Sequence, residues 1–120
     1  MKWTDIWQPP FWYDHYGYVF AKDNVMVFTV EDLTEENDKF MNDLACNISA
    51  VLNGHSINEE DKYKNLEIKD GCDLYMNDEL LGSFRGWGHL TGGLKLSYAD
   101  ACAMQNDMMN FVLSKIKKND

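Results

Sequence analysis

The sequence has little cysteine, little proline and no long apolar run, and each shortage excludes a class of protein. Its three cysteines, Cys46, Cys72 and Cys102, lie far apart and form no C-x-x-C pair, which favours reduced thiols in a cytoplasm over a disulfide framework. No stretch approaches the roughly 20 apolar residues that span a bilayer. The first ten residues carry an early aspartate and two prolines rather than the apolar centre of a secretory signal. We therefore expect a cytoplasmic protein that does not enter a membrane.

The sequence also lacks a catalytic or metal-binding motif of high specificity. His15, His55 and His89 stand neither in H-E-x-x-H nor beside a cysteine at ligand spacing. Cys102 falls in the first turns of a predicted helix, where the helix dipole lowers a thiol pKa, but its alanine neighbours favour a small packing residue. No nucleophile pairs with a base. We predict that the protein is not an enzyme and that it uses no catalytic residue, metal or cofactor.

Negative charge is the most uneven property of the composition. The formal net charge is −9, and between residues 31 and 61 only Lys39 opposes nine acids, so this segment carries −8. Such a field repels phosphate backbones, which argues against direct nucleic-acid binding and suits a basic protein partner. The alternative is a solvated face that keeps the protein soluble. The predicted partner-binding residues are the acids of this segment other than Asp43: Glu31, Asp32, Glu35, Glu36, Asp38, Glu59, Glu60 and Asp61.

The 120 residues, 45% of them hydrophobic, fit one α+β domain. Alternating β-branched and aromatic residues, separated by turn residues, predict strands over 17–21, 25–30, 65–69, 72–76 and 79–85. Apolar residues at helical spacing, with possible capping boxes at Asp32–Glu35 and Ser97–Asp100, predict helices over 34–53 and 97–117. The order β-β-α-β-β-β-α implies an antiparallel sheet of about five strands with two helices on one face. Whether the first hairpin joins the later strands in one sheet is left open.

Eight aromatic side chains crowd the first twenty residues: Trp3, Trp7, Phe11, Trp12, Tyr13, Tyr16, Tyr18 and Phe20. Pro9 and Pro10 predict a stiff, extended N-terminal arm over about residues 1–16. Aromatic residues at this density form either the lid of a core or a binding surface. The arm therefore either wraps its own domain or offers an exposed patch to another protein or to a base.

Residues 85–93 read Arg-Gly-Trp-Gly-His-Leu-Thr-Gly-Gly, with four glycines around one tryptophan. The spacing fits neither the dinucleotide fingerprint nor a Walker loop, so a wide turn anchored by Trp87 is one interpretation. The other is an anion cradle near a helix start, with a tryptophan stacking on a base. Its residues are Arg85, Gly86, Trp87, Gly88, Thr91, Gly92, Lys95 and Trp12. We expect Trp87 to be at least half buried against Tyr98 and Cys102; an exposed binding residue is the competing view.

This loop, followed by the stretch from Ala101 to Asp107, resembles a pattern found in small uncharacterised proteins of phages, prophages and other mobile elements of gut bacteria. In those proteins a glycine–tryptophan loop precedes a helix with a glutamine–acid pair, here Gln105 and Asp107. The resemblance covers about the last third of the chain and brings no known activity. It implies a protein of the bacterial cytoplasm with a viral context, where small acidic accessory proteins often inhibit host defence.

The sequence thus leads to two hypotheses about function. The first is an acidic phage-type interaction protein, an inhibitor of a bacterial defence system such as a CRISPR effector, whose acids engage a basic nucleic-acid channel. The second is a protein that binds a small ligand or nucleotide and so sequesters a signal. An enzyme is the third and weakest interpretation.

Overall fold

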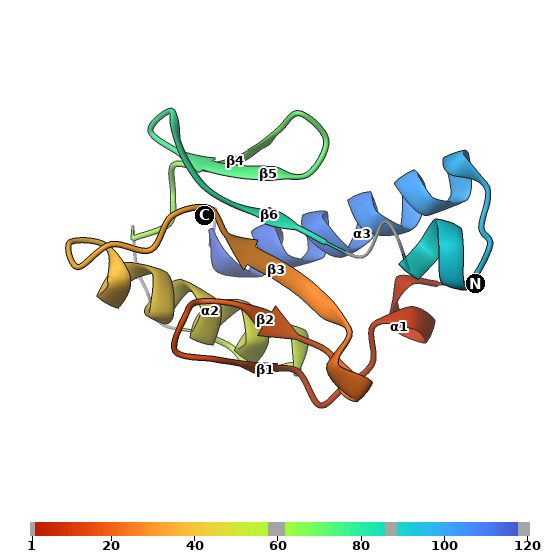
Figure 1. Cartoon of the computed structure of the whole chain (residues 1–120). Helices are drawn as coiled ribbons and strands as arrows, with labels where there is room; N and C mark the ends of the chain where they lie inside the picture. Colours follow the sequence, from red (N-terminus) through yellow and green to blue (C-terminus); the bar gives the residue numbers. More distant parts are fainter. Residues whose placement is uncertain (1, 58–61, 86–88, 118–120) are drawn as a thin grey trace.

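The computed structural model describes residues 2–57, 62–85 and 89–117, and within them six strands form one antiparallel sheet (Figure 1). The spatial order is β1-β2-β3-β6-β5-β4, so sequence neighbours pair everywhere except where β3 meets β6. The bounds are β1 (Trp12–Tyr13), β2 (Val19–Phe20), β3 (Met26–Val30), β4 (Leu66–Lys69), β5 (Asp73–Met76) and β6 (Glu79–Phe84). The α+β class is confirmed, with six strands where about five were predicted.

Turn residues with positive φ close the hairpins. Asn77 and Asp78, at φ 53° and 65°, join β5 to β6, and Asp70 and Gly71, at φ 54° and 87°, lie between β4 and β5. Two successive residues with positive φ give the turn whose twist matches that of paired strands. The meander predicted from these dipeptides is confirmed.

Pairing of β3 with β6 joins the first hairpin to the meander. Phe28 stands opposite Phe84, their rings 5.1 Å apart, and Val30 stands opposite Gly82. Phe28, Phe84 and Leu74 are each at most 1% exposed, so this row is the core side of the sheet. The question left open by the sequence is answered: both hairpins belong to one sheet.

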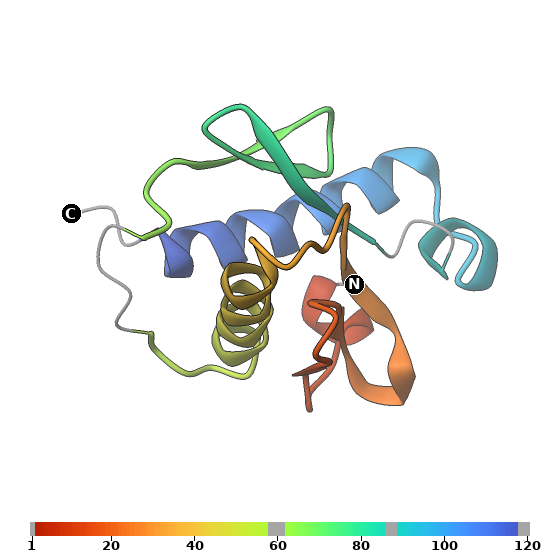
Figure 2. The ribbon, with the colours of Figure 1, turned by 60° about the vertical axis from the view of Figure 1, so that its left-hand side comes forward.

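Two long helices, α2 (Asp38–Leu52) and α3 (Tyr98–Ile116), lie on the core side of the sheet and pack against each other (Figure 1). Figure 2 shows α3 running beneath β4–β6 while α2 lies beside β1 and β2. Short helical segments complete the described chain: α1 (Trp3–Ile6), a 3₁₀ turn (Lys22–Asn24) and a π-helical turn (His89–Gly93). No helix in the described ranges has the length and apolar character needed to cross a bilayer.

Two predictions about element boundaries are wrong. Helix α2 begins at Asp38 rather than near residue 34, because Thr34 and Asn37 bond to each other in a turn, and Asp32 caps nothing. By contrast Ser97 caps α3 as expected, its Oγ accepting from the Asp100 N–H at 3.2 Å. The N-terminal arm is not simply extended either, since it contains α1 and then β1, which pairs with β2.

Candidate functional site: an acidic–aromatic surface and a pocket

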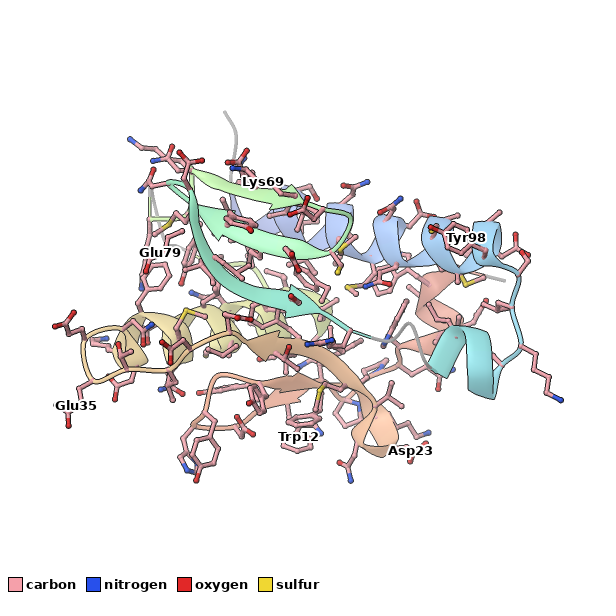
Figure 3. The ribbon with its side chains drawn as sticks, turned by 45° about the horizontal axis from the view of Figure 1, so that its top comes forward. Trp12, Asp23, Glu35, Lys69, Glu79 and Tyr98 are labelled. Carbon is pink, nitrogen blue, oxygen red and sulfur yellow. The ribbon has the colours of Figure 1, made fainter. Side chains whose placement is uncertain are left out.

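Five of the predicted partner-binding acids lie together between the end of β3 and the first residue of α2. They are Glu31, Asp32, Glu35, Glu36 and Asp38, and all five side chains are exposed. None of them forms an ion pair with another described residue. Glu35 projects from one end of the molecule in Figure 3. The segment is therefore a concentrated, unneutralised negative charge; we call residues 31–38 the acidic loop.

Asn37 holds the acidic loop in shape. Its Oδ1 accepts from the Thr34 N–H at 2.7 Å, and its Nδ2 donates to the Asp32 carbonyl at 2.9 Å. In return the Thr34 hydroxyl accepts from the Asn37 N–H at 3.2 Å. These bonds join uncharged groups and leave the carboxylates unbonded, so the loop's backbone is fixed while its charge stays available.

Asp43 is the one acid between residues 31 and 61 that is not a predicted partner-binding residue, and its charge is neutralised. Its Oδ2 lies 2.9 Å from Lys39 Nζ and 3.2 Å from Lys62 Nζ. Hydrogen bonds from Lys39 and then Lys62 hold the pKa of this carboxyl below its usual value. The remaining predicted acids, Glu59, Glu60 and Asp61, lie outside the described residues.

The turn between β1 and β2 packs against the two elements that flank the acidic loop, β3 and α2. Gly17, at φ +87°, sits so close to Val30 that an added methyl group would collide with Val30 Cγ2, and the same methyl would touch Met41. Val30 immediately precedes the acidic loop and Met41 lies in the first turns of α2, so the turn packs against the elements on either side of the loop. Tyr16 in this turn is 56% exposed, with its ring centroid 4.2 Å from that of His15. We call the acidic loop together with Tyr13, His15 and Tyr16 the acidic–aromatic surface.

The N-terminal aromatic residues divide between the two roles that the sequence left open. Trp7 and Phe11 are at most 5% exposed, and Trp3 packs on Phe111 of α3 with ring centroids 5.2 Å apart. Tyr13 is 43% exposed beside α2, where a hydrogen bond with Cys46 raises the pKa of its hydroxyl. The arm both wraps its own domain and exposes an aromatic patch.

A pocket of about 460 Å³ lies at the other end of the molecule, between the first half of α3, the β4–β5 turn and the end of β6. Its described walls include Phe84, which is buried, and the half-buried thiols of Cys72 and Cys102. Burial, and then the charge of Asp73, raises the pKa of the Cys72 thiol, and nearby Arg85 opposes this. A protonated thiol makes this wall neutral and largely apolar.

Polar groups stand at the rim and on the floor of the same pocket. Arg85, the one arginine in the sequence, lines it, and so does Gln105 of α3, which is 6% exposed. Gln105 Nε2 donates to the Phe84 carbonyl at 3.1 Å, and Arg85 Nε donates to Thr29 Oγ1 at 3.0 Å. Asp70, Asn106 and Tyr98 complete the polar lining.

Those of the other predicted anion-cradle residues that the structure describes do not gather around Arg85. Gly92 and Lys95 are exposed and are not among the described residues of the pocket wall. Trp12 stacks on Phe20 at 4.3 Å in β1, which β2 and β3 separate from β6. Gly86, Trp87 and Gly88 lie outside the described residues, as does the side chain of Thr91, so the burial expected for Trp87 stays a prediction.

Sequence reasoning did not place Gln105 or Asn106 in a binding site. A signal for Gln105 was present, because it interrupts the apolar stripe formed by Met104, Met108 and Val112. A polar side chain within such a stripe must find a partner in the interior. The partner is a strand carbonyl far away in sequence, which no local pattern reveals.

Among the described residues, no three His, Cys, Asp or Glu side chains converge as metal ligands would. Comparison of the chain with protein-family profiles, with curated proteins and with solved structures finds no match.

Proposed function

We propose that this protein is a non-enzymatic binding protein whose acidic–aromatic surface engages a basic surface of another protein. The observation that carries the proposal is a loop with five exposed carboxylates that have no described ion-pair partner, followed and preceded by residues, Met41 and Val30, that lie against the turn carrying the exposed Tyr16. Complementary charge speeds encounter and selects the partner, and exposed aromatic residues supply the buried anchors of an interface. The fixed backbone of the acidic loop reduces the entropy lost on binding.

The partner that fits this chemistry is a bacterial defence nuclease with a basic nucleic-acid channel, a CRISPR effector being one example. Carboxylates spaced along an ordered loop offer such a channel negative charge in place of phosphates. The net charge of −9 opposes direct binding of nucleic acid by this chain. The resemblance of the glycine–tryptophan loop to phage and prophage proteins supports the same setting in the bacterial cytoplasm.

The test measures DNA cleavage by a panel of purified bacterial defence nucleases with and without the protein. The parent chain is expected to inhibit at least one member and to co-elute with it. Reversal of Glu31, Asp32, Glu35 and Glu36 to lysine is expected to weaken that binding roughly 100-fold, because the channel then meets like charge. Salt is expected to weaken the parent's binding through screening.

A matched pair of variants separates local charge from net charge. Glu35→Gln with Glu36→Gln removes two charges from the acidic loop, and Asp23→Asn with Asp107→Asn removes two exposed charges elsewhere. Asp23 and Glu35 lie far apart in Figure 3. Only the first pair is expected to weaken binding. Equal effects of the two pairs, a parent chain that inhibits no nuclease, or full inhibition by the lysine reversals each contradict the proposal.

A further inference from the structure

The pocket beside α3 has features that the acidic–aromatic surface does not use. A chain with 20 acidic residues places its one arginine on this rim, and no described carboxylate forms an ion pair with it. Within the part of the chain that the structure describes, Arg85 is therefore a cation available to a ligand in this pocket.

The contacts of Arg85 prepare it to bind an anion. Its Nε donates to Thr29 Oγ1 at 3.0 Å, which fixes the guanidinium and leaves the two Nη groups without a described partner. These are the groups that bind phosphate or carboxylate through two parallel hydrogen bonds. The guanidinium also acts on the Cys72 thiol of the pocket wall, lowering its pKa against the effect of burial. The positive charge therefore faces the pocket.

Gln105 offers the pocket a hydrogen-bond acceptor, whereas Arg85 offers donors. Its side chain is more than nine-tenths buried, and its Nε2 is fixed by the Phe84 carbonyl. Its Oε1 accepts no hydrogen bond from any described residue, yet it is not one of the atoms sealed from solvent without a partner. Because Gln105 lines the pocket, a ligand there can reach this acceptor. An acceptor in this position suits a ligand that donates an N–H.

The rest of the wall selects the shape and polarity of the ligand. Phe84 and the half-buried thiols of Cys72 and Cys102 make this part of the wall apolar, which favours a flat body with apolar faces. Asp70 at the rim repels an anion on its own side and accepts further N–H groups. The ligand must carry its negative charge toward Arg85 and its donors toward Gln105 and Asp70.

We propose that this pocket binds a nucleoside monophosphate, with the phosphate on Arg85 and the N–H edge of the base on Gln105. A volume of about 460 Å³ lies within the range of small-ligand pockets. The base lies between the apolar walls, and the phosphate stays at the exposed rim. This site is separate from the acidic–aromatic surface, so it stands or falls independently of the proposed function.

The test is the melting temperature of the purified full chain with AMP, GMP, CMP or UMP at about 1 mM, and with inorganic phosphate or guanosine alone. At least one monophosphate is expected to raise Tm by about 5 °C. Phosphate alone and the nucleoside alone are expected to give less than half that shift. A phosphate shift equal to that of every nucleotide, or no shift with any nucleotide, overturns the proposal.

Three variants locate the site. Arg85→Gln is expected to weaken binding at least 10-fold by calorimetry, whereas Lys95→Gln, which removes an exposed charge outside the described pocket wall, leaves it unchanged. Cys102→Phe fills the pocket without altering charge and is expected to abolish binding. Each variant is first checked for an unaltered melting transition without ligand. Binding that survives both Arg85→Gln and Cys102→Phe overturns the assignment, and if either variant fails to fold the other decides.

Discussion

The acidic loop and the Arg85 pocket lie at opposite ends of the molecule and present polar groups in opposite ways. At the acidic end, carboxylates such as Glu35 extend into solvent, and the hydrogen bonds of Asn37 shape only the backbone (Figure 3). At the pocket end, near Tyr98 in the same view, polar groups are bonded into the sheet: Gln105 to Phe84 and Arg85 to Thr29. The first arrangement suits a large partner that brings its own surface. The second suits a small ligand that must find fixed partners.

The difference has an energetic consequence. Exposed charges add little to folding stability, so the acidic loop is open to change without loss of the fold. A buried amide that satisfies a buried carbonyl is costly to remove. Substitutions at the two ends are therefore expected to differ in effect. Changes to the carboxylates of the acidic loop are expected to weaken binding without loss of stability, whereas changes at the pocket floor are expected to lower both.

The largest loss is expected from breaking the contact between the β1–β2 turn and Val30, the residue that precedes the acidic loop. Gly17→Ala places a methyl group against Val30 at φ +87°, so strain and overpacking act together. We expect a loss of about 2–4 kcal/mol in the free energy of unfolding, measured by urea denaturation. Gly54→Ala is the control, since Gly54 has φ +89° but nothing near the added methyl, and about 1 kcal/mol is expected. Equal losses of unfolding free energy at the two glycines would contradict the close packing of Gly17 against Val30.

The strands and helices show which parts of the fold the sequence predicts and which parts it does not. Local patterns located the hairpins at Asp70–Gly71 and Asn77–Asp78 and both long helices, because turn chemistry and apolar spacing act over a few residues. The pairing of β3 with β6 joins residues more than fifty positions apart and leaves no local trace. β1 is two residues long, too short for any alternation to reveal.

The two candidate sites differ in the same respect. The acidic segment is contiguous, so composition alone predicts a cluster of acids from Glu31 to Asp38, whereas the lysine partners of Asp43 are visible only in the structure. The pocket takes Arg85 from the end of β6, Gln105 from α3 and Asp70 from a turn. Sequence reasoning reached Arg85 through its glycine neighbours but joined it to Trp12, which lies across the sheet. A candidate site formed by one contiguous segment can be predicted from the sequence, whereas a candidate site formed by three separate segments requires the folded structure.

A second prediction compares the two ends directly. Gln105→Leu leaves the Phe84 carbonyl without its partner, and we expect a loss of about 1–2 kcal/mol. The pair Glu35→Gln and Glu36→Gln is expected to change the free energy of unfolding by less than about 0.5 kcal/mol, because both side chains are exposed and unpaired. Urea denaturation of both variants gives the comparison. A Gln105→Leu variant as stable as the parent would show that the hydrogen bond from Gln105 to the Phe84 carbonyl does not stabilise the pocket floor.

A smaller effect is expected for the residue that shapes the acidic loop. Asn37→Ala removes the bonds to Thr34 and Asp32, both near the surface, and the expected cost is about 1 kcal/mol. Binding to the basic partner is expected to weaken as well, since the loop backbone is no longer held. Asn110→Ala, an exposed position on α3, serves as the control and is expected to alter neither property. Partner binding that is unchanged in Asn37→Ala shows that loop order is irrelevant to recognition.

The smallest expected effect concerns Asp43, the acid beside the acidic loop that is neutralised. Hydrogen bonds from Lys39 and Lys62 lower the pKa of its carboxyl in the folded chain. Because the pKa of Asp43 is lower in the folded chain than in the unfolded chain, its ionised carboxylate stabilises the fold at pH values above the unfolded-state pKa, about 3.9. This contribution is lost as the pH falls through the folded-state pKa. The parent is thus expected to melt slightly above Asp43→Asn near pH 6, with the gap closing below about pH 4 and shrinking in high salt. A gap that stays constant from pH 6 to pH 3 contradicts an ionic role for Asp43, and with it the distinction drawn between Asp43 and the unpaired acids of the loop.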